Sequence, residues 1–171
     1  MKNLSLLFTK DGLQWQINEA DNVTEEEARF VTDETPENFI EEELDKILRR
    51  EAWAEIKVFS AFNHFSLTPE VFTENQLGQQ IISYNSDVKT ESEELMRSIN
   101  QKYGVQFYYS FPKHFYQKIK DLSSISNFHF SGERFLDSVN VNKDNEIHIN
   151  LYHNQVEFLA LENGKLVLYN N

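Results

Sequence analysis

Short apolar stretches at both ends of the chain have the length and alternation of β-strands. Near the N-terminus, residues 3–9 and 13–19 flank the dipeptide Asp11-Gly12, which is typical of tight hairpin turns. Near the C-terminus, three such runs are separated by two polar turns: 147–152, 156–161 and 165–169. We therefore predict a hairpin at one end, a three-strand meander at the other, and a duplicated α/β half-domain whose second copy is cut short.

The segment after the N-terminal hairpin changes to helical spacing. Residues 28–32 can supply a third strand, and Thr35 then precedes Pro36, which is favoured at the first position of a helix. Acidic residues follow at once and basic residues come last, an order that suits the helix dipole. Apolar positions, Phe39 or Ile40 and then Leu44, Ile47 and Leu48, share one face. The pattern predicts a helix over residues 36–54.

The middle of the chain alternates between strand and helix signals. Residues 56–62 and 65–67 are expected to be strands, and residues 68–70 a capped helical turn. Thr73 with Gln76 resembles a capping box, which predicts a helix to about Tyr84.

Two readings are open for residues 91–104. Helix propensity favours a helix over 91–102, whereas a hairpin centred at Tyr103-Gly104 would lead equally well into a strand at 105–111.

The segment before the final meander is expected to hold two helices and a strand. Pro112 would start a helix that carries Phe115, Ile119 and Leu122 on its apolar face. A strand is expected at 125–130, after which Ser131 would cap a helix over 133–139.

Composition restricts the class of protein. The 171 residues hold 40% hydrophobic positions and 14 Phe, enough for a globular core. Cysteine is absent, which excludes disulfides and thiolate metal sites and fits a cytoplasmic location. The net charge of −12 disfavours nucleic-acid binding, and no apolar run is long enough to span a membrane. The acidic residues between 19 and 45 are expected to form a solvated surface, with a docking face for a basic partner as the alternative reading.

The order of these elements resembles one half of the actin-like ATPase fold. More narrowly, the segments 65–72, 108–113 and 164–170 resemble a bacterial family, the domain of unknown function 3822. The resemblance implies an α/β fold, with a mixed sheet and flanking helices of the ribonuclease H-like type. It places a first actin-like lobe at residues 1–142 and the opening β-meander of a second, truncated lobe at residues 143–171.

The same resemblance implies where nucleotide chemistry would lie. Actin-like ATPases hold phosphates between two hairpin turns that carry Asp-x-Gly, where the Asp orients Mg²⁺ and the Gly admits the phosphates. Here the first turn is Thr9-Lys10-Asp11-Gly12, so Lys10 stands at the Asp position and only Asp11 and Gly12 are weak candidates. The second turn, residues 153–156, has neither Asp nor Gly. Both phosphate turns are interpreted as lost.

Other catalytic and metal-binding patterns are missing. No phosphate-loop motif, dinucleotide motif or nucleophile elbow occurs, and His148 and His153 would point to opposite faces of a strand. Trp15 and Trp53 are expected in the core, and one of Tyr108 and Tyr109 is expected to be exposed.

The function predicted from these observations is binding without catalysis. We expect a cytoplasmic, non-catalytic actin-like module without a cofactor or metal, which acts through a protein partner or as a homodimer. The alternative is a Mg-nucleotide-binding ATPase or phosphotransferase with a drifted phosphate loop at Thr9–Gly12. A truncated second lobe would leave one apolar face of the meander at 143–171 uncovered, and a second copy of the chain is the simplest cover.

Overall fold

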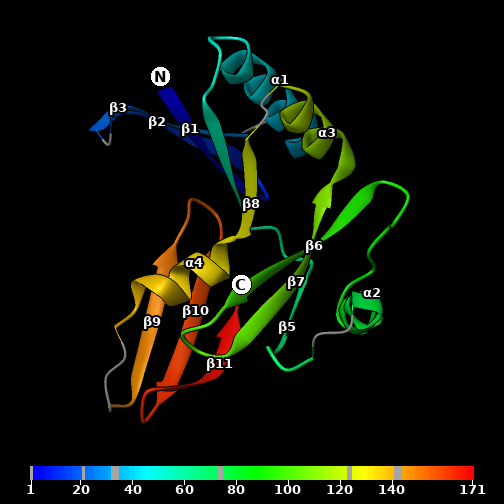
Figure 1. Ribbon diagram of the computed structural model, residues 1–171, viewed down its shortest axis with the longest axis vertical. Helices are drawn as coiled ribbons and strands as arrows, with labels where there is room; N and C mark the ends of the chain where they lie inside the picture. The colour runs from blue at the N-terminus through cyan, green and yellow to red at the C-terminus, as the bar shows by residue number, and fades with distance from the viewer. Residues whose placement is uncertain (1, 21, 32–34, 73–74, 123–124, 141–143) are drawn as a thin grey trace.

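A computed structural model of the chain describes residues 2–20, 22–31, 35–72, 75–122, 125–140 and 144–171. It contains one five-stranded and two three-stranded sheets, together with four helices in these residues. Figure 1 shows the five-stranded sheet with helices α1 and α3 in the upper part of the molecule and the two smaller sheets below it. The mixed α/β architecture predicted from the sequence is therefore confirmed.

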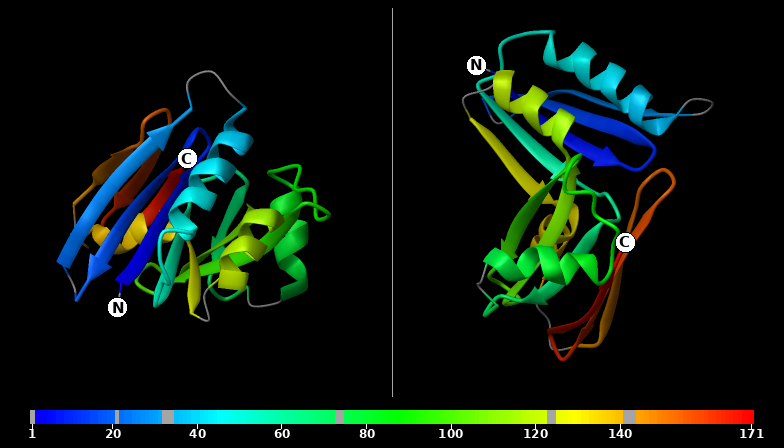
Figure 2. Two further views of the ribbon diagram at one scale, coloured as in Figure 1. Left: turned by 90° about the horizontal axis from the view of Figure 1, so that it is seen from above. Right: turned by 90° about the vertical axis from the view of Figure 1, so that its right-hand side faces the viewer.

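The five-stranded sheet has the order β3-β2-β1-β4-β8. Its strands are β1 (Lys2–Thr9), β2 (Gly12–Glu19), β3 (Asn22–Phe30), β4 (Glu55–Ser60) and β8 (Ser126–Phe130). The first three are antiparallel neighbours, whereas β1, β4 and β8 run parallel. The helices α1 (Pro36–Leu48) and α3 (Lys113–Leu122) lie on the same face of this sheet (Figure 2). They bury the alternate apolar residues of the strands, including Leu4, Leu6 and Phe8.

Helix α1 begins as predicted but ends earlier. Thr35 is extended and Pro36 takes the first helical position, although the Thr35 side chain makes no capping hydrogen bond. The predicted extension to residue 54 is wrong, because the chain turns after Leu48 to begin β4. The Ala54 amide already donates to the Lys2 carbonyl (3.0 Å), while Trp53 packs into the core from the connecting segment.

The second sheet is built from residues inserted between β4 and α3. Its order is β5-β7-β6, from β5 (Phe65–Pro69), β7 (Val105–Pro112) and β6 (Glu93–Asn100), and helix α2 (Asn75–Ser83) precedes β6. The hairpin reading of residues 91–104 is thus confirmed and the helix reading is wrong. Gly104 supports the turn with φ +64°. The predicted capping box at Thr73 lies outside the described residues.

Several boundaries in this region differ from the sequence-based expectation. Thr68 and Pro69 belong to β5 instead of a helical turn, because they pair with Gln106 and Val105. Pro112 ends β7 opposite Glu93, so α3 begins one residue later.

The expectation that one of Tyr108 and Tyr109 is exposed is wrong. Tyr108 is 3% exposed and Tyr109 1%. Helix α2 covers Tyr108 on one face, where a Cβ at Gly78 would lie only 2.5 Å from its ring, whereas Tyr109 faces the second core cluster. Leu122, predicted on the apolar face of α3, is 54% exposed because the helix ends there.

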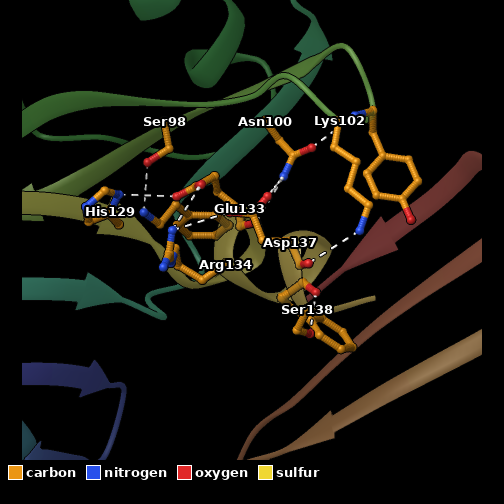
Figure 3. A network of polar contacts seen from close by, with 11 residues as sticks. Ser98, Asn100, Lys102, His129, Glu133, Arg134, Asp137 and Ser138 are labelled. Atoms are coloured by element: carbon orange, nitrogen blue, oxygen red, sulfur yellow. Dashed lines mark hydrogen bonds and ion pairs between the residues drawn. The ribbon is translucent and has the colours of Figure 1, made fainter. Parts of the chain in front are cut away.

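Helix α4 (Ser131–Ser138) connects the first part of the chain to the final meander. Ser131 is its first residue and not its cap: its hydroxyl donates to Glu157, outside the helix. Asn100 anchors the other end by donating to Asp137 Oδ1 (2.8 Å), and Lys102 donates to the Asp137 carbonyl (3.3 Å) (Figure 3). The side chains of β6 and its turn therefore satisfy C-terminal groups of the helix.

The C-terminal meander forms the third sheet, with the order β11-β10-β9. Its strands are β9 (Glu146–Leu151), β10 (Val156–Glu162) and β11 (Lys165–Asn170). Asn163 and Gly164 both have positive φ in the last turn, as a two-residue hairpin requires. Leu159, Leu161 and Tyr169 face the second core cluster, whereas Ile147, Ile149 and Leu151 on the opposite face are 74%, 62% and 72% exposed. The uncovered apolar face expected from the sequence is therefore present.

Candidate functional site

The two hairpin turns singled out in the sequence meet in space. The β1–β2 turn contains Asp11 and the β9–β10 turn contains His153, and the Nδ1 of His153 lies 2.9 Å from Asp11 Oδ2. Backbone amide Lys10 N–H points to Gln155 Oε1 at 3.5 Å. The His153 ring also stacks on Phe30 with 4.2 Å between ring centroids. Side chains of the protein thus join the two turns directly; we call this set of contacts the turn latch.

Asp11 is held by partners within the protein. Its side chain is 10% exposed; one oxygen accepts the Thr9 hydroxyl (3.0 Å) and the other faces His153. The Asp11 carbonyl accepts the Val31 amide (2.8 Å), which ties the turn to the end of β3. Both carboxylate oxygens of Asp11 thus already have a partner within the protein.

Gly12 has a packing role in this turn. A Cβ at this position would lie 2.3 Å from the Arg29 carbonyl oxygen and 2.6 Å from the Phe30 ring. Glycine is therefore needed for the close approach of β2 to β3. The packing of β2 against β3 therefore explains why residue 12 is glycine, and no bound phosphate is needed to explain it.

Gln155 extends the latch to the end of the chain. Its amide nitrogen donates to the Ala61 carbonyl and to Asn171 Oδ1, and the Asn171 amide donates to the same Ala61 carbonyl (3.1 Å). Because Gln155 is 7% exposed, these bonds are shielded from water. The second turn, β4 and the C-terminus are therefore fixed together.

The histidines pair with carboxylates one by one. The pairs are His64–Glu93, His114–Glu37, His129–Glu133, His148–Glu146 and His153–Asp11. Within the described part of the chain, no three His, Asp or Glu residues are grouped so that they could hold a metal ion. His64, His129, His148 and His153 lie within hydrogen-bonding distance of their carboxylates, whereas His114 lies 3.6 Å from Glu37.

A buried carboxylate anchors the meander beneath the latch. Glu157 is fully buried and accepts the hydroxyls of Tyr152 (2.8 Å) and Tyr169 (3.1 Å), together with the amide of Asn150 (3.1 Å) and the hydroxyl of Ser131. Burial, followed by the nearby Glu157 charge, raises the pKa of Tyr152 and of Tyr169. Four donors satisfy this carboxylate, so the cluster serves packing and leaves no free coordination position.

The sequence of this chain matches the model of a known protein family. The family model described as a protein of unknown function (DUF3822) matches residues 1–171. The chain belongs to this family. A search of curated proteins found no match.

A solved structure has the same fold. It is a protein with actin-like ATPase fold and unknown function from Bacteroides thetaiotaomicron, matched with a TM-score of 0.80 at 17% identity. The match covers 99% of this chain and 68% of that one. The resemblance to the actin-like ATPase fold inferred from the sequence is thereby confirmed at the level of fold.

Sequence reasoning found one half of the latch and missed the other. It identified Asp11 and Gly12 and the positions of both turns, and the structure brings those turns together. It did not identify His153, Gln155 or Phe30 as contacts. For His153 and Gln155 there was one signal: polar residues stand in the second turn where the fold would have Asp and Gly.

No helix in the described residues has the length and apolar character that a membrane crossing requires.

Proposed function

We propose that this protein is a non-catalytic actin-like module of the cytoplasm, which acts by binding another protein chain. The observation that supports this proposal is the turn latch, in which His153 and Gln155 occupy the space between the two turns. In the fold that the chain resembles, nucleotide phosphates take this place. Asp11 is already engaged by His153 and Thr9, and Gly12 is needed for packing against β3.

We also propose that residues 143–171 correspond to the opening strands of a second lobe, after a first lobe at residues 1–142. The sheet order β11-β10-β9 repeats the order β3-β2-β1 of the N-terminal strands. Both sets are antiparallel and joined by short turns.

The nucleotide question is tested by thermal unfolding with and without Mg-ATP. We expect no shift of the midpoint for the wild-type chain, because binding would require the latch to open. Asp11→Ala is the test variant. Asp121→Ala, at an exposed position near the end of α3, is the matched control.

A stabilisation that depends on Mg²⁺ and disappears in Asp11→Ala but not in Asp121→Ala would overturn the non-catalytic assignment. That result would instead support the alternative, a nucleotide-binding ATPase or phosphotransferase with its phosphate loop at Thr9–Gly12.

A further inference from the structure

A cavity of about 450 Å³ lies between the second sheet and the helices α1 and α3. Its walls come from the β1–β2 turn, the start of α1, the link between β4 and β5, the loop before β6, and the junction of β7 with α3. The described residues that line it all lie between positions 10 and 115, so the C-terminal sheet takes no part in its walls. Cavities of this size between packed units are a common place for small ligands.

Apolar side chains form the most deeply buried part of this cavity. Ile40 and Phe115 are buried members of the first core cluster, and the partly buried Phe62 packs against them. Pro36 and Pro112, where α1 begins and β7 ends, complete the apolar lining. The cavity can therefore shield the apolar part of a ligand from water.

Two carboxylates at the cavity already have protein groups beside them. Glu93 accepts the backbone amide of Lys89 (2.8 Å) and lies 3.3 Å from His64 Nδ1. Glu37 lies 3.6 Å from His114 Nε2 and stands in the first turn of α1, where the helix dipole stabilises a negative charge. The charges of Glu93 and Glu37 are thus stabilised without a ligand.

Three other charged side chains at the cavity have no partner in the described part of the chain. They are Lys10 and Lys89, with their ammonium groups, and Asp87, with its carboxylate. Among the described Lys and Arg side chains, Arg97 and Lys165 alone share this lack of a partner, and the others contact a carboxylate or a carbonyl oxygen.

Unpaired bases are unexpected in this chain, which has 28 acidic residues against 16 Lys and Arg. Two of the four that the described residues contain nevertheless line the same cavity, together with an unpaired acid. Lysine carries its charge on a flexible stem, so both ammonium groups can reach a ligand from the rim.

We propose that this cavity binds a small zwitterion with an apolar side chain, as a free apolar amino acid has. The ligand carboxylate pairs with Lys10 and Lys89, and the ligand ammonium pairs with Asp87. The apolar side chain packs on Phe62 and Pro36. This site goes beyond the proposed function and does not depend on it.

The charges at the cavity disfavour ligands of a single sign. A phosphate ester, with its two negative charges, would meet the carboxylates of Glu37, Asp87 and Glu93 at the same cavity. A cation would leave both unpaired lysines without a partner. A zwitterion supplies one group of each sign, and this complementarity is the basis for selection among ligands.

Three probes with the same aromatic ring test the charge requirement. L-phenylalanine is the zwitterion, 3-phenylpropanoate lacks its ammonium, and 2-phenylethylamine lacks its carboxylate. We expect L-phenylalanine to bind about fivefold more tightly than either of the others at neutral pH and low salt, because each of them loses one charge contact. NMR titration of the ¹⁵N-labelled chain measures the affinities, and the amide signals that move should include those of Lys10, His64 and Lys89.

Variants of the unpaired residues separate the two charge contacts. Lys89→Gln should weaken binding of L-phenylalanine and 3-phenylpropanoate about fivefold and leave that of 2-phenylethylamine unchanged. Asp87→Asn should weaken L-phenylalanine and 2-phenylethylamine and leave 3-phenylpropanoate unchanged. Lys165→Gln removes an unpaired lysine outside the cavity and is the matched control, which should alter no affinity. All three positions are exposed, so the variants should fold.

Equal affinities of the three probes would refute the zwitterion site. So would equal losses in Lys89→Gln and Lys165→Gln, or amide signals at the cavity that stay in place up to the solubility limit of L-phenylalanine. Each of these results leaves the proposed function standing, because that function is tested at Asp11 with Mg-ATP. A Mg²⁺-dependent stabilisation by ATP that is lost in Asp11→Ala would overturn the function and leave the zwitterion site.

Discussion

The first and last three strands of this chain share one pattern and differ in what surrounds them. β1–β3 and β9–β11 are both antiparallel, with the N-terminal strand of each set at one border. β1 then pairs with β4 on its second edge and packs against α1 and α3, so that Leu4, Leu6 and Phe8 are fully buried. β9 has no strand on its second edge among the described residues, and Ile147, Ile149 and Leu151 are exposed.

The difference shows that the alternation of apolar residues in a strand marks the face that is suited to burial, but does not determine which other element buries it. The N-terminal set finds its helices and its fourth strand within residues 36–60 and 113–130. The C-terminal set packs one face on the second core cluster and leaves Ile147, Ile149 and Leu151 of the other face exposed.

The largest expected difference between the two sets is in stability. Phe8→Ala should lower the free energy of unfolding by about 4 kcal/mol, since Phe8 is fully buried and contacts Phe62, Phe111 and Phe115. Ile149→Ala should change it by no more than about 0.5 kcal/mol in the monomer. Urea unfolding at low protein concentration measures both; equal losses would show that the outer face of the meander is covered in solution.

The meander should depend on Glu157, a carboxylate that is fully buried within it. Glu157→Ala should cost about 3 kcal/mol, because Tyr152, Tyr169, Asn150 and Ser131 would lose the acceptor they share. Glu162→Ala, at the exposed end of the same strand, is the control and should be nearly neutral. The measurement is chemical denaturation at neutral pH; matching losses would contradict a structural role for Glu157.

The two sets should also respond differently to alkaline pH. Burial, then the Glu157 charge, raises the pKa of Tyr152 and Tyr169 above the ordinary value of 10.0. The unfolded chain therefore releases these protons first, so their contribution is complete below about pH 10 and is lost as the pH rises further. The free energy of unfolding should fall by up to about 1.4 kcal/mol per pH unit for each tyrosine.

Tyr169→Phe tests this dependence. It should flatten the alkaline decline, and Tyr84→Phe, at an 85% exposed position, should leave it unchanged. Absorbance of the tyrosinate against pH, together with unfolding at two alkaline pH values, checks the expectation. An unchanged slope in Tyr169→Phe would show that this hydroxyl does not carry the effect.

The smallest expected effect concerns the latch that joins the two sets. His153→Ala should cost about 1 kcal/mol, because His153 is half exposed and water competes for its hydrogen bond with Asp11. His148→Ala removes a comparable pair with Glu146, within one strand, and serves as control. Amide exchange should become faster at Lys10 in His153→Ala only; a change of equal size in both variants would argue against a specific link between the turns.

Local sequence signals were reliable where short-range chemistry decides the structure. The Asp11-Gly12 and Asn163-Gly164 turns, the start of α1 at Pro36 and the strand leading to Phe111 follow from residue type and alternation. The end of α1 and the burial of both Tyr108 and Tyr109 did not, because Trp53 and helix α2 are placed by contacts with distant segments.

Some features of the candidate site could likewise be predicted from the sequence, and others could not. The resemblance to the actin-like fold, applied to the residues of the first turn, predicted that this turn lacks the Asp-x-Gly pattern and that Asp11 and Gly12 are its nearest substitutes. That His153 meets Asp11, and that Gln155 meets Lys10, depends on the packing of two sheets formed by residues far apart in the chain.

Outside residues 68–70 and 91–104, the sequence by itself determined the strand and helix order, together with the family and the apolar alternation of β9, because these depend on neighbouring residues and on composition. Only the tertiary structure decided which alternate faces became core, since burial needs a covering element whose position is set by long-range packing. It closed the space between the two turns with His153 and Gln155, and it exposed Ile149 at an open edge. The proposed binding role rests on the first of these outcomes.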